Sequence, residues 1–333
     1  MADKKARTVK VSLIQSGPQT ENIEQNMDDL LKTMDEVGNR EHPDFVLAGE
    51  LSYLPYIGAV LDKKYFDWAK SIPGPTTERF AEKAKKYGMC ILLGVFEKAP
   101  AEGVYHNSTV VLGPDGNVIK GIFPDGRKTL RYTKTHIPYV VAKRSEYYDE
   151  TVHLPPSWGT SITPPAGYRN GYDETFYFTA GDGWPIFNTP KAKIGITTCF
   201  DRHFPEPYRV LALQGAEIIF TPSVAMAFSA ERGASMAETY LIELQVRALE
   251  NSVWLATVNK AGTEYLEGQP TYCYGNSALM HPTGEVVAKG SADKAEVVSY
   301  ELDLEDISMT RRLLPLFAQR KPELYDIITL KGR

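Results

Sequence analysis

Residues 195–206 read Gly-Ile-Thr-Thr-Cys-Phe-Asp-Arg-His-Phe-Pro-Glu, and they place one cysteine at the end of an apolar, β-leaning segment. A helix is expected to begin near Pro205 and Glu206, since proline is common in the first helical turn. Backbone N–H groups and positive charge at such a turn can stabilise a thiolate, so Cys199 is a candidate nucleophile that we expect to remain exposed enough to react. The alternative is a small buried hydrophobic residue, the commoner fate of an unpaired cysteine.

Two further segments carry an ionisable residue at the same kind of place. The run Phe45–Gly49 is short and apolar, and the carboxylate of Glu50 follows it. Residues 131–138 read Arg-Tyr-Thr-Lys-Thr-His-Ile-Pro, which puts Lys134 at the end of a hairpin-like stretch. An acid, a lysine and a cysteine therefore each lie where a predicted strand gives way to a loop.

In this order, Glu50, Lys134 and Cys199 resemble the catalytic set of the nitrilase superfamily of carbon–nitrogen hydrolases. The motifs that carry the resemblance are residues 48–51, 132–138 and 198–206. Further similar stretches are residues 213–223, 247–251 and 275–285, so that the resemblance extends from about Lys10 to about Tyr325.

The resemblance implies both a fold and a set of roles. The fold would be α/β, a four-layer αββα sandwich of the nitrilase type. Glu50 would be the base, and Lys134 with the backbone N–H of Phe200 would hold the oxyanion. In the similar branch a second glutamate lies eight residues before the Asp of a Pro/Ala-Gly-Asp turn, which nominates Glu174. A solvated loop carboxylate is the alternative for Glu174.

The cysteine motif, Cys-x-Asp-Arg-x-x-Pro-Glu, is similar to that of enzymes that hydrolyse N-carbamoyl amino acids. Arg202 could grip a substrate carboxylate through two parallel hydrogen bonds, or it could pair with Asp201 or Glu206. The relatives that act on carbamoyl-D-amino acids have a second basic residue after this arginine and a histidine two residues before the second glutamate. This chain has His203 and Tyr172 there.

We therefore expect a cofactor-free amidohydrolase that converts an N-carbamoyl amino acid to the amino acid, CO2 and ammonia through a thioester-type intermediate. Tyr172 and His136 would lie beside the substrate, although His136 is equally explained as a packed, hydrogen-bonded residue. Met226 and Phe228 either line an apolar pocket or belong to the core. The alternatives are an aliphatic or aromatic carboxamide amidase or a nitrilase with the same three residues, or a binding or scaffold protein without chemistry.

Composition limits the other possibilities. The chain has 333 residues, 43% of them hydrophobic, and a net charge of −5. We expect one domain over residues 1–333, since no Gly/Ser-rich or charged run suggests a linker. No basic cluster with aromatic residues suggests nucleic acid, and no apolar run suggests a membrane span or a signal peptide. A cytoplasmic enzyme acting on a small molecule is expected. Its three cysteines lack the spacing of a disulfide framework or a metal site.

Two segments stand outside the regular pattern. Residues 139–173 form a long insertion rich in Tyr, Pro and Gly, which we expect to cover the pocket and shape the choice of substrate. The tail from about residue 310 would, by the resemblance, cross between the subunits of a homo-oligomer, a dimer or a tetramer.

Apolar periodicity predicts the regular elements as follows. Strands are expected over 9–15, 45–49, 89–95, 193–198, 218–221 and 253–259, helices over 22–37, 76–87, 207–214 and 234–251, and hairpin turns at 114–117 and 282–285.

Overall fold

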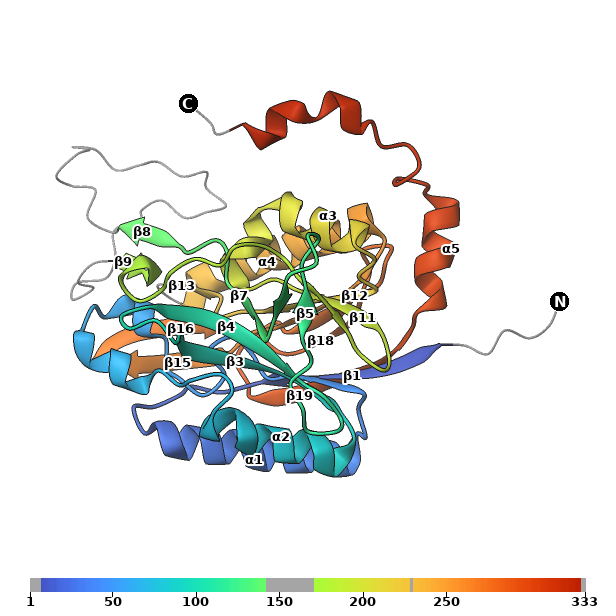
Figure 1. Ribbon diagram of the computed structural model, residues 1–333. Coiled ribbons are helices and arrows are strands. Elements are labelled where there is room, and N and C mark those ends of the chain that lie inside the picture. Colours follow the sequence, from blue (N-terminus) through green and yellow to red (C-terminus); the bar gives the residue numbers. More distant parts are fainter. Residues whose placement is uncertain (1–6, 142–170, 228–229, 331–333) are drawn as a thin grey trace.

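A computed structural model describes residues 7–141, 171–227 and 230–330 of the chain. Two sheets form its centre (Figure 1). The first is a six-stranded sheet with the order β19-β1-β2-β3-β4-β7. Its strands are β1 (Thr8–Gln15), β2 (Phe45–Leu47), β3 (Cys90–Lys98), β4 (Tyr105–Leu112), β7 (Arg131–Thr133) and β19 (Glu296–Asp303).

The second sheet has eight strands in the order β18-β17-β14-β12-β11-β10-β5-β6. Its strands are β5 (Gly121–Ile122), β6 (Lys128–Thr129), β10 (Ile186–Asn188), β11 (Lys193–Ile196), β12 (Ile218–Pro222), β14 (Trp254–Val258), β17 (Ala278–Met280) and β18 (Val286–Lys289). In both sheets the central strands are parallel, β1-β2-β3 in the first and β11-β12-β14 in the second. The carboxyl ends of these strands therefore share one edge of each sheet.

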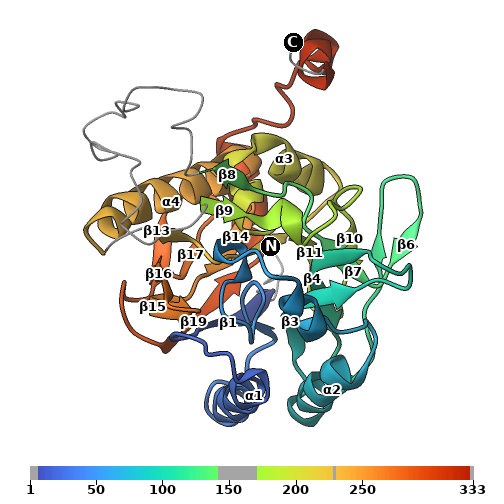
Figure 2. The same cartoon turned by 90° about the vertical axis from the view of Figure 1, so that its left-hand side faces the viewer.

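Helices cover the outer faces of the two sheets (Figures 1 and 2). Helices α1 (Ile23–Arg40) and α2 (Pro75–Tyr87) lie against the six-stranded sheet, and α3 (Pro205–Leu213) and α4 (Ala230–Asn251) lie against the eight-stranded one. One buried cluster joins the inner faces, with Val11 and Leu47 from the first sheet and Ile194 and Phe220 from the second. The four-layer αββα sandwich expected from the sequence is confirmed.

Smaller elements surround the end of the sandwich where the site lies. A three-stranded sheet contains β13 (Met226–Ala227), β15 (Ala261–Leu266) and β16 (Gln269–Tyr274), and a two-stranded ribbon contains β8 (Tyr139–Val141) and β9 (Gly171–Asp173). The predicted insertion thus begins and ends in paired strands, and its residues 142–170 lie outside the described part. Short 3-10 turns are η1 (Ile57–Ala59), η2 (Lys63–Trp68), η4 (Glu174–Phe176), η5 (Cys199–His203), η6 (Pro322–Leu324) and η7 (Asp326–Thr329).

The sequence predicted most elements to within a few residues, with three differences. The strand expected over 45–49 ends at Leu47, because Gly49 adopts a left-handed conformation with φ +105°. The turn expected at 114–117 forms and Val118 bridges back to Leu112, but the pairing is short, because β5 then joins β10 of the other sheet. The β15–β16 hairpin was not anticipated, because its turn is Glu-Gly rather than Asn-Gly or Asp-Gly.

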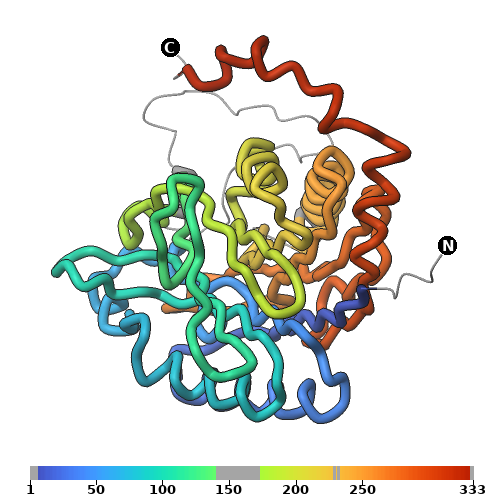
Figure 3. Tube along the Cα trace, turned by 45° about the vertical axis from the view of Figure 1, so that its right-hand side comes forward, coloured from blue at the N-terminus to red at the C-terminus, as the bar shows by residue number. Residues whose placement is uncertain are grey.

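The carboxyl-terminal tail leaves the sandwich after α5 (Glu305–Leu313) and arches over the side occupied by α3 and α4 (Figure 3). It exposes large apolar side chains, among them Leu324 at 71%, Ile327 at 73% and Leu330 at 70%. Within the ranges that the structure describes, no helix is both long enough and apolar enough to cross a membrane.

Gly94 in β3 allows the close approach of the turn that carries Glu50. A Cβ atom at this position would lie 2.3 Å from the carbonyl oxygen of Gly49 and 2.7 Å from the backbone nitrogen of Leu51. Because both contacts are backbone, Gly94→Ala should move the turn, lower the free energy of unfolding by about 1–3 kcal/mol and reduce activity. Chemical denaturation and ammonia release measure the two effects.

Gly17→Ala is the matched control, since its added Cβ would make an ordinary 3.5 Å contact with Ala295. Wild-type stability and activity in Gly94→Ala would show that the turn does not depend on this contact.

Candidate active site

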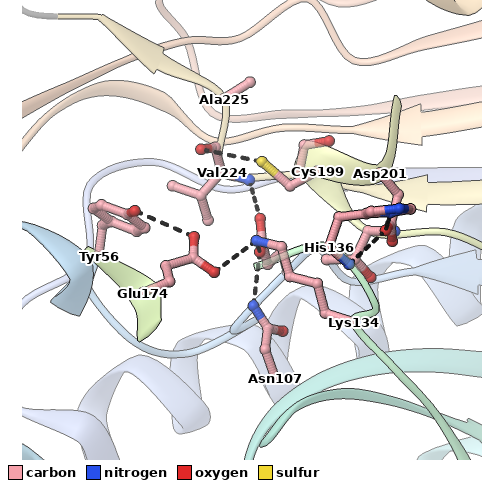
Figure 4. A network of polar contacts seen from close by, with 12 residues as sticks. Tyr56, Asn107, Lys134, His136, Glu174, Cys199, Asp201, Val224 and Ala225 are labelled. Atoms are coloured by element: carbon pink, nitrogen blue, oxygen red, sulfur yellow. Dashed lines mark hydrogen bonds and ion pairs between the residues drawn. The ribbon is translucent and has the colours of Figure 1, made fainter. Parts of the chain in front are cut away.

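The three residues singled out from the sequence converge where the two sheets meet, and Figure 4 labels two of them, Lys134 and Cys199. Glu50 follows β2 and Lys134 follows β7, both in the six-stranded sheet, whereas Cys199 follows β11 of the eight-stranded sheet. All three side chains are buried, as is that of Glu174. The alternative interpretation of Glu174 as a solvated loop carboxylate is therefore wrong.

The ammonium group of Lys134 lies between two carboxylates. Its Nζ donates to Oε1 of Glu50 at 2.8 Å and to Oε2 of Glu174 at 2.7 Å. Burial by itself lowers the pKa of Lys134, but the negative charges of Glu174 and Glu50 outweigh that effect and raise it. Lys134 is therefore a permanent cation and a hydrogen-bond donor rather than a base.

Glu50 is held by donors from both sheets. Its Oε1 also accepts from Nδ2 of Asn107 at 2.7 Å, and its Oε2 accepts from the backbone N–H of Val224 at 2.6 Å. Asn107 lies in β4 of the first sheet, and Val224 follows β12 of the second. These bonds fix the orientation of a buried carboxylate, which otherwise has a high desolvation cost.

Glu174 completes the charged group from the start of η4. The hydroxyl of Tyr56 donates to its Oε1 at 3.2 Å, while Lys134 occupies its other oxygen. Burial raises the pKa of Glu174 to about 7, against the opposing charge of Lys134 and together with the like charge of Glu50. This carboxyl group can therefore change its charge near neutral pH.

Cys199 adopts a left-handed backbone conformation with φ +46°, a strained geometry for a residue with a side chain that is often found at functional turns. Its Sγ lies 3.7 Å from the carbonyl oxygen of Val224, the same residue whose N–H binds Glu50. The Cys199 thiol and the Glu50 carboxylate therefore contact the carbonyl oxygen and the N–H of one residue, Val224, and Figure 4 shows the contact of the thiol.

One expectation about this thiol was wrong, because the surroundings of Cys199 disfavour its thiolate instead of stabilising it. Cys199 is only 8% exposed, and its pKa is raised to about 12 rather than lowered. Burial and the negative charge of Glu50 raise it, and they outweigh the positive charges of Lys134 and Arg202. Cys199 rests as a thiol, so its reaction as a nucleophile requires a neighbouring base.

Asp201 joins the cysteine turn to the lysine motif. Its carboxylate accepts from the backbone N–H of Thr198 at 2.8 Å, from Nδ1 of His136 at 2.7 Å and from the hydroxyl of Tyr132. His136 also stacks on Phe204, with ring centroids 3.8 Å apart. His136 is thus a packed, hydrogen-bonded residue that braces the turn, the second of the two roles considered for it.

The guanidinium group of Arg202 lies beside the thiol. Its Nη1 is 3.1 Å from the carbonyl oxygen and 3.8 Å from the Sγ of Cys199, and its Nε donates to Glu243 of α4 at 3.0 Å. His203 binds the other oxygen of Glu243 at 2.7 Å. Arg202 therefore pairs with neither Asp201 nor Glu206 but with a carboxylate 41 residues further along the chain.

The remaining expected site residues are placed less fully. Phe200 is the first residue after the thiol, in the first turn of η5. The backbone of Tyr172 pairs with Val140 in the β8–β9 ribbon, and the Tyr172 side chain lies outside the described residues, as does Phe228. Met226 is partly buried and packs against a cluster that contains Tyr56 and Val224.

Some members of the polar network had no signal in the sequence. Asn107 lies in the middle of a strand, and Val224 acts through its backbone N–H, which every residue except proline possesses. Tyr56 lies in the loop after the Glu50 motif, but nothing in the spacing indicates the direction of its hydroxyl group. An aromatic residue soon after Pro55 in a loop was the only available hint.

A buried thiol, a carboxylate and an ammonium group thus lie together at the meeting edges of two sheets, as the resemblance to the nitrilase superfamily led us to expect. The chain belongs to the carbon–nitrogen hydrolase family, whose model matches residues 10–312. It is thus a carbon–nitrogen hydrolase that acts on non-peptide C–N bonds.

Known proteins resemble the chain over most of its length. N-carbamoylputrescine amidase of Solanum lycopersicum is 30% identical over 297 residues, which cover 87% of this chain and 85% of that protein. Omega-amidase NIT2 of Xenopus tropicalis is 28% identical over 266 residues, 79% of this chain and 80% of that protein.

Solved structures share the fold. A carbon–nitrogen hydrolase from Helicobacter pylori aligns with a TM-score of 0.79 and 24% identity over 98% of this chain and 99% of its own. An amidase from Nesterenkonia sp. AN1, solved with the acetamide moiety of fluoroacetamide bound covalently to its active-site cysteine, aligns with a TM-score of 0.65 and 17% identity over 98% of both chains.

The raised pKa of Glu174 predicts a pH dependence. As the pH falls through about 7, Glu174 takes up a proton and the ammonium of Lys134 loses one of its two carboxylates. We expect kcat/KM to fall over this range in the wild type. The fall in kcat/KM at low pH is the acidic limb of the pH profile. Glu174→Gln should be at least about tenfold less active, and its profile should lack the acidic limb because the amide does not titrate.

Ammonia release between pH 5.5 and 8.5 provides the measurement, with the exposed Glu102→Gln as the control that keeps the limb. An acidic limb at the same pH in Glu174→Gln would assign the titration to another group.

Proposed function

We propose that the protein hydrolyses the carbamoyl C–N bond of an N-carbamoyl amino acid and releases the amino acid, CO2 and ammonia. The observation that carries the proposal is the position of Arg202, whose guanidinium lies 3.8 Å from the thiol. A cation in this position suits a substrate that carries a carboxylate close to its ureido group. The name of the tomato relative, N-carbamoylputrescine amidase, supports the carbamoyl half of the proposal.

In the first half-reaction, Glu50 accepts the proton of Cys199 while Sγ forms a bond to the ureido carbon. Lys134, with the backbone N–H of Phe200, stabilises the oxyanion of the tetrahedral adduct. The adduct then breaks its bond to the amino nitrogen, which takes the proton from Glu50 and leaves as the amino acid. A carbamoyl thioester remains on Cys199. The thiol's high pKa supports a base-assisted attack, since very little thiolate exists beforehand.

In the second half-reaction, Glu50 takes a proton from water, and the oxygen attacks the thioester carbon. The C–S bond breaks, the proton returns to the sulfur of Cys199, and carbamic acid leaves and decomposes to CO2 and ammonia. The role of Glu174 is to keep Lys134 in place and charged. Both contacts of Lys134 persist through the cycle in this scheme, so only Glu50 exchanges protons.

The charge balance around Arg202 sets the substrate preference. Glu243 neutralises Arg202 in the free enzyme, so a substrate carboxylate must share the guanidinium with it. A plain carboxamide would require no such sharing, and the omega-amidase relative supports that second candidate. The two functions use the same Glu50, Lys134 and Cys199.

A substrate panel distinguishes the two candidates. We expect ammonia release from D- or L-N-carbamoyl amino acids or N-carbamoyl-β-alanine, and none from Cys199→Ala. Arg202→Gln should raise KM for a ureido acid about 10- to 100-fold, because charge-assisted hydrogen bonds are lost. The KM for an uncharged amide should change much less.

Arg127→Gln, in an exposed hairpin, is the control for loss of an arginine. Turnover confined to uncharged amides or nitriles would reject the ureido-acid proposal and favour the amidase.

We also infer that the protein forms homo-oligomers through its tail. Apolar residues exposed in one copy, such as Ile327 and Leu330, stand on a segment that extends away from the body of the protein (Figure 3). The α3 and α4 face that the tail arches over also exposes Leu213 at 49% and Ile242 at 59%. Covering such a surface with a second copy would remove it from water.

Substitutions in the tail test this inference. Ile327→Asp with Leu330→Asp should convert the assembly to a smaller species in analytical ultracentrifugation. In a monomer the same changes would leave the free energy of unfolding nearly unchanged, because both side chains are already exposed. Tyr265→Asp, at an exposed aromatic position on β15, is the control. An unchanged sedimentation coefficient in the tail variant would contradict the inference.

A further inference from the structure

A second buried ion pair lies close to the site but outside the group already described. Lys260, just after β14, and Glu264, in β15, are each 3% exposed, and Nζ of Lys260 is 3.1 Å and 3.3 Å from the two carboxylate oxygens of Glu264. Burying two charges costs several kcal/mol per ion before they attract each other, and an apolar pair of similar volume is often as stable. Stability alone therefore does not account for this pair.

The pair binds the backbone of the loop that follows Glu50. Lys260 donates to the carbonyl oxygen of Leu54, and Oε1 of Glu264 accepts from the backbone N–H of Tyr56 at 2.6 Å. Oε2 of Glu264 accepts from the backbone N–H of Gln19 at 3.2 Å. A buried loop without regular structure has to satisfy such groups with side chains. Here two of them belong to residues 54 and 56, immediately before η1.

Tyr56 connects this pair with the site. Its backbone is fixed by Glu264, its ring is buried against Ala59, Val224 and Cys273, and its hydroxyl donates to Glu174 at 3.2 Å. The position of the hydroxyl therefore depends on the position of a backbone nitrogen that the ion pair holds.

We infer that Lys260 and Glu264 are positioning residues, which act through Tyr56 to hold Glu174 against the ammonium of Lys134. Within the part of the chain that the structure describes, neither residue forms a hydrogen bond with Cys199, Glu50 or Lys134, so their effect is transmitted by the loop. The inference deepens the proposed function and rests on it for the role of Glu174. It adds Lys260 and Glu264 to the residues on which the activity of Glu50, Lys134 and Cys199 depends.

The inference predicts the direction in which the pH profile of the reaction rate should shift when the Tyr56 contact is lost. The groups that face the Glu174 carboxylate are the Lys134 ammonium, the Glu50 carboxylate and the Tyr56 hydroxyl. A hydrogen bond from Tyr56 favours the ionised form of Glu174. When the bond is lost, Glu174 holds its proton up to a higher pH. The acidic limb of the rate profile should then move to higher pH, and the rate at neutral pH should fall.

The test replaces both charges together in the full-length protein. Lys260→Met with Glu264→Leu leaves no unpaired buried charge but removes the partners of Tyr56 N–H and Leu54 C=O. We expect kcat to fall about tenfold at pH 7, the acidic limb to move upward, and KM to change little. Tyr56→Phe should produce the same shift, and adding it to the double variant should produce little more, because the two changes interrupt one path.

Two further variants keep the test decisive. Glu264→Gln retains an oxygen for Tyr56 N–H and should move the limb less, and it serves if the double variant does not fold. Asp35→Asn disrupts the cluster with Lys83 and Tyr87 between α1 and α2, and should reduce stability without moving the limb.

Other results would overturn the inference. These are an acidic limb that stays in place while activity falls, or fully additive effects of Tyr56→Phe and the double variant. The pH dependence of Cys199 alkylation by iodoacetamide, followed by mass spectrometry and compared between the wild type and the variants, tests without a substrate whether loss of the Tyr56 contact reaches the thiol. Failure of the ureido-acid proposal is thereby distinguished from failure of this one.

Discussion

The placement of one ammonium group between two buried carboxylates is the constraint on which the site depends. Lys134 satisfies Glu50 and Glu174 at once, and each of these then has an oxygen left for a neutral donor, Val224 N–H or Tyr56. Without the cation, two carboxylates within reach of each other in a dry interior would not both ionise. In the proposed mechanism the same cation also stabilises the oxyanion.

The two sheets make that arrangement possible. Parallel central strands end on one edge of each sheet, and loops leave there with residues whose polar groups have no strand partner. The bonds from Val224 to Glu50 and from Tyr132 to Asp201 both cross from one sheet to the other. The inner faces of the two sheets are thus joined by apolar side chains, and the edges of the sheets at the site are joined by these polar contacts.

Local order in the chain explains which features could be predicted. Glu50 and Cys199 each follow an apolar strand, whose end is visible as a change in hydrophobicity, whereas Lys134 follows the Arg-Tyr-Thr strand β7 and was found from its motif. The pairing of Arg202 with Glu243 was not visible, because α4 approaches the cysteine turn only in three dimensions. The pairing after the turn at residues 114–117 is shorter than expected for a related reason. A Pro-Asp-Gly-Asn turn predicts a reversal of the chain, but competition between two sheets decides where the returning strand pairs.

Asp201 links chemistry to architecture in a further way. It fastens the turn of the nucleophile to the strand that precedes the lysine, so the distance between thiol and ammonium is set by how closely the sheets pack. Loops at the rim can lengthen or change composition without altering that distance. Changes in these loops can therefore alter the range of substrates. The spacing between the thiol and the ammonium group stays the same, because the packing distance of the two sheets sets it.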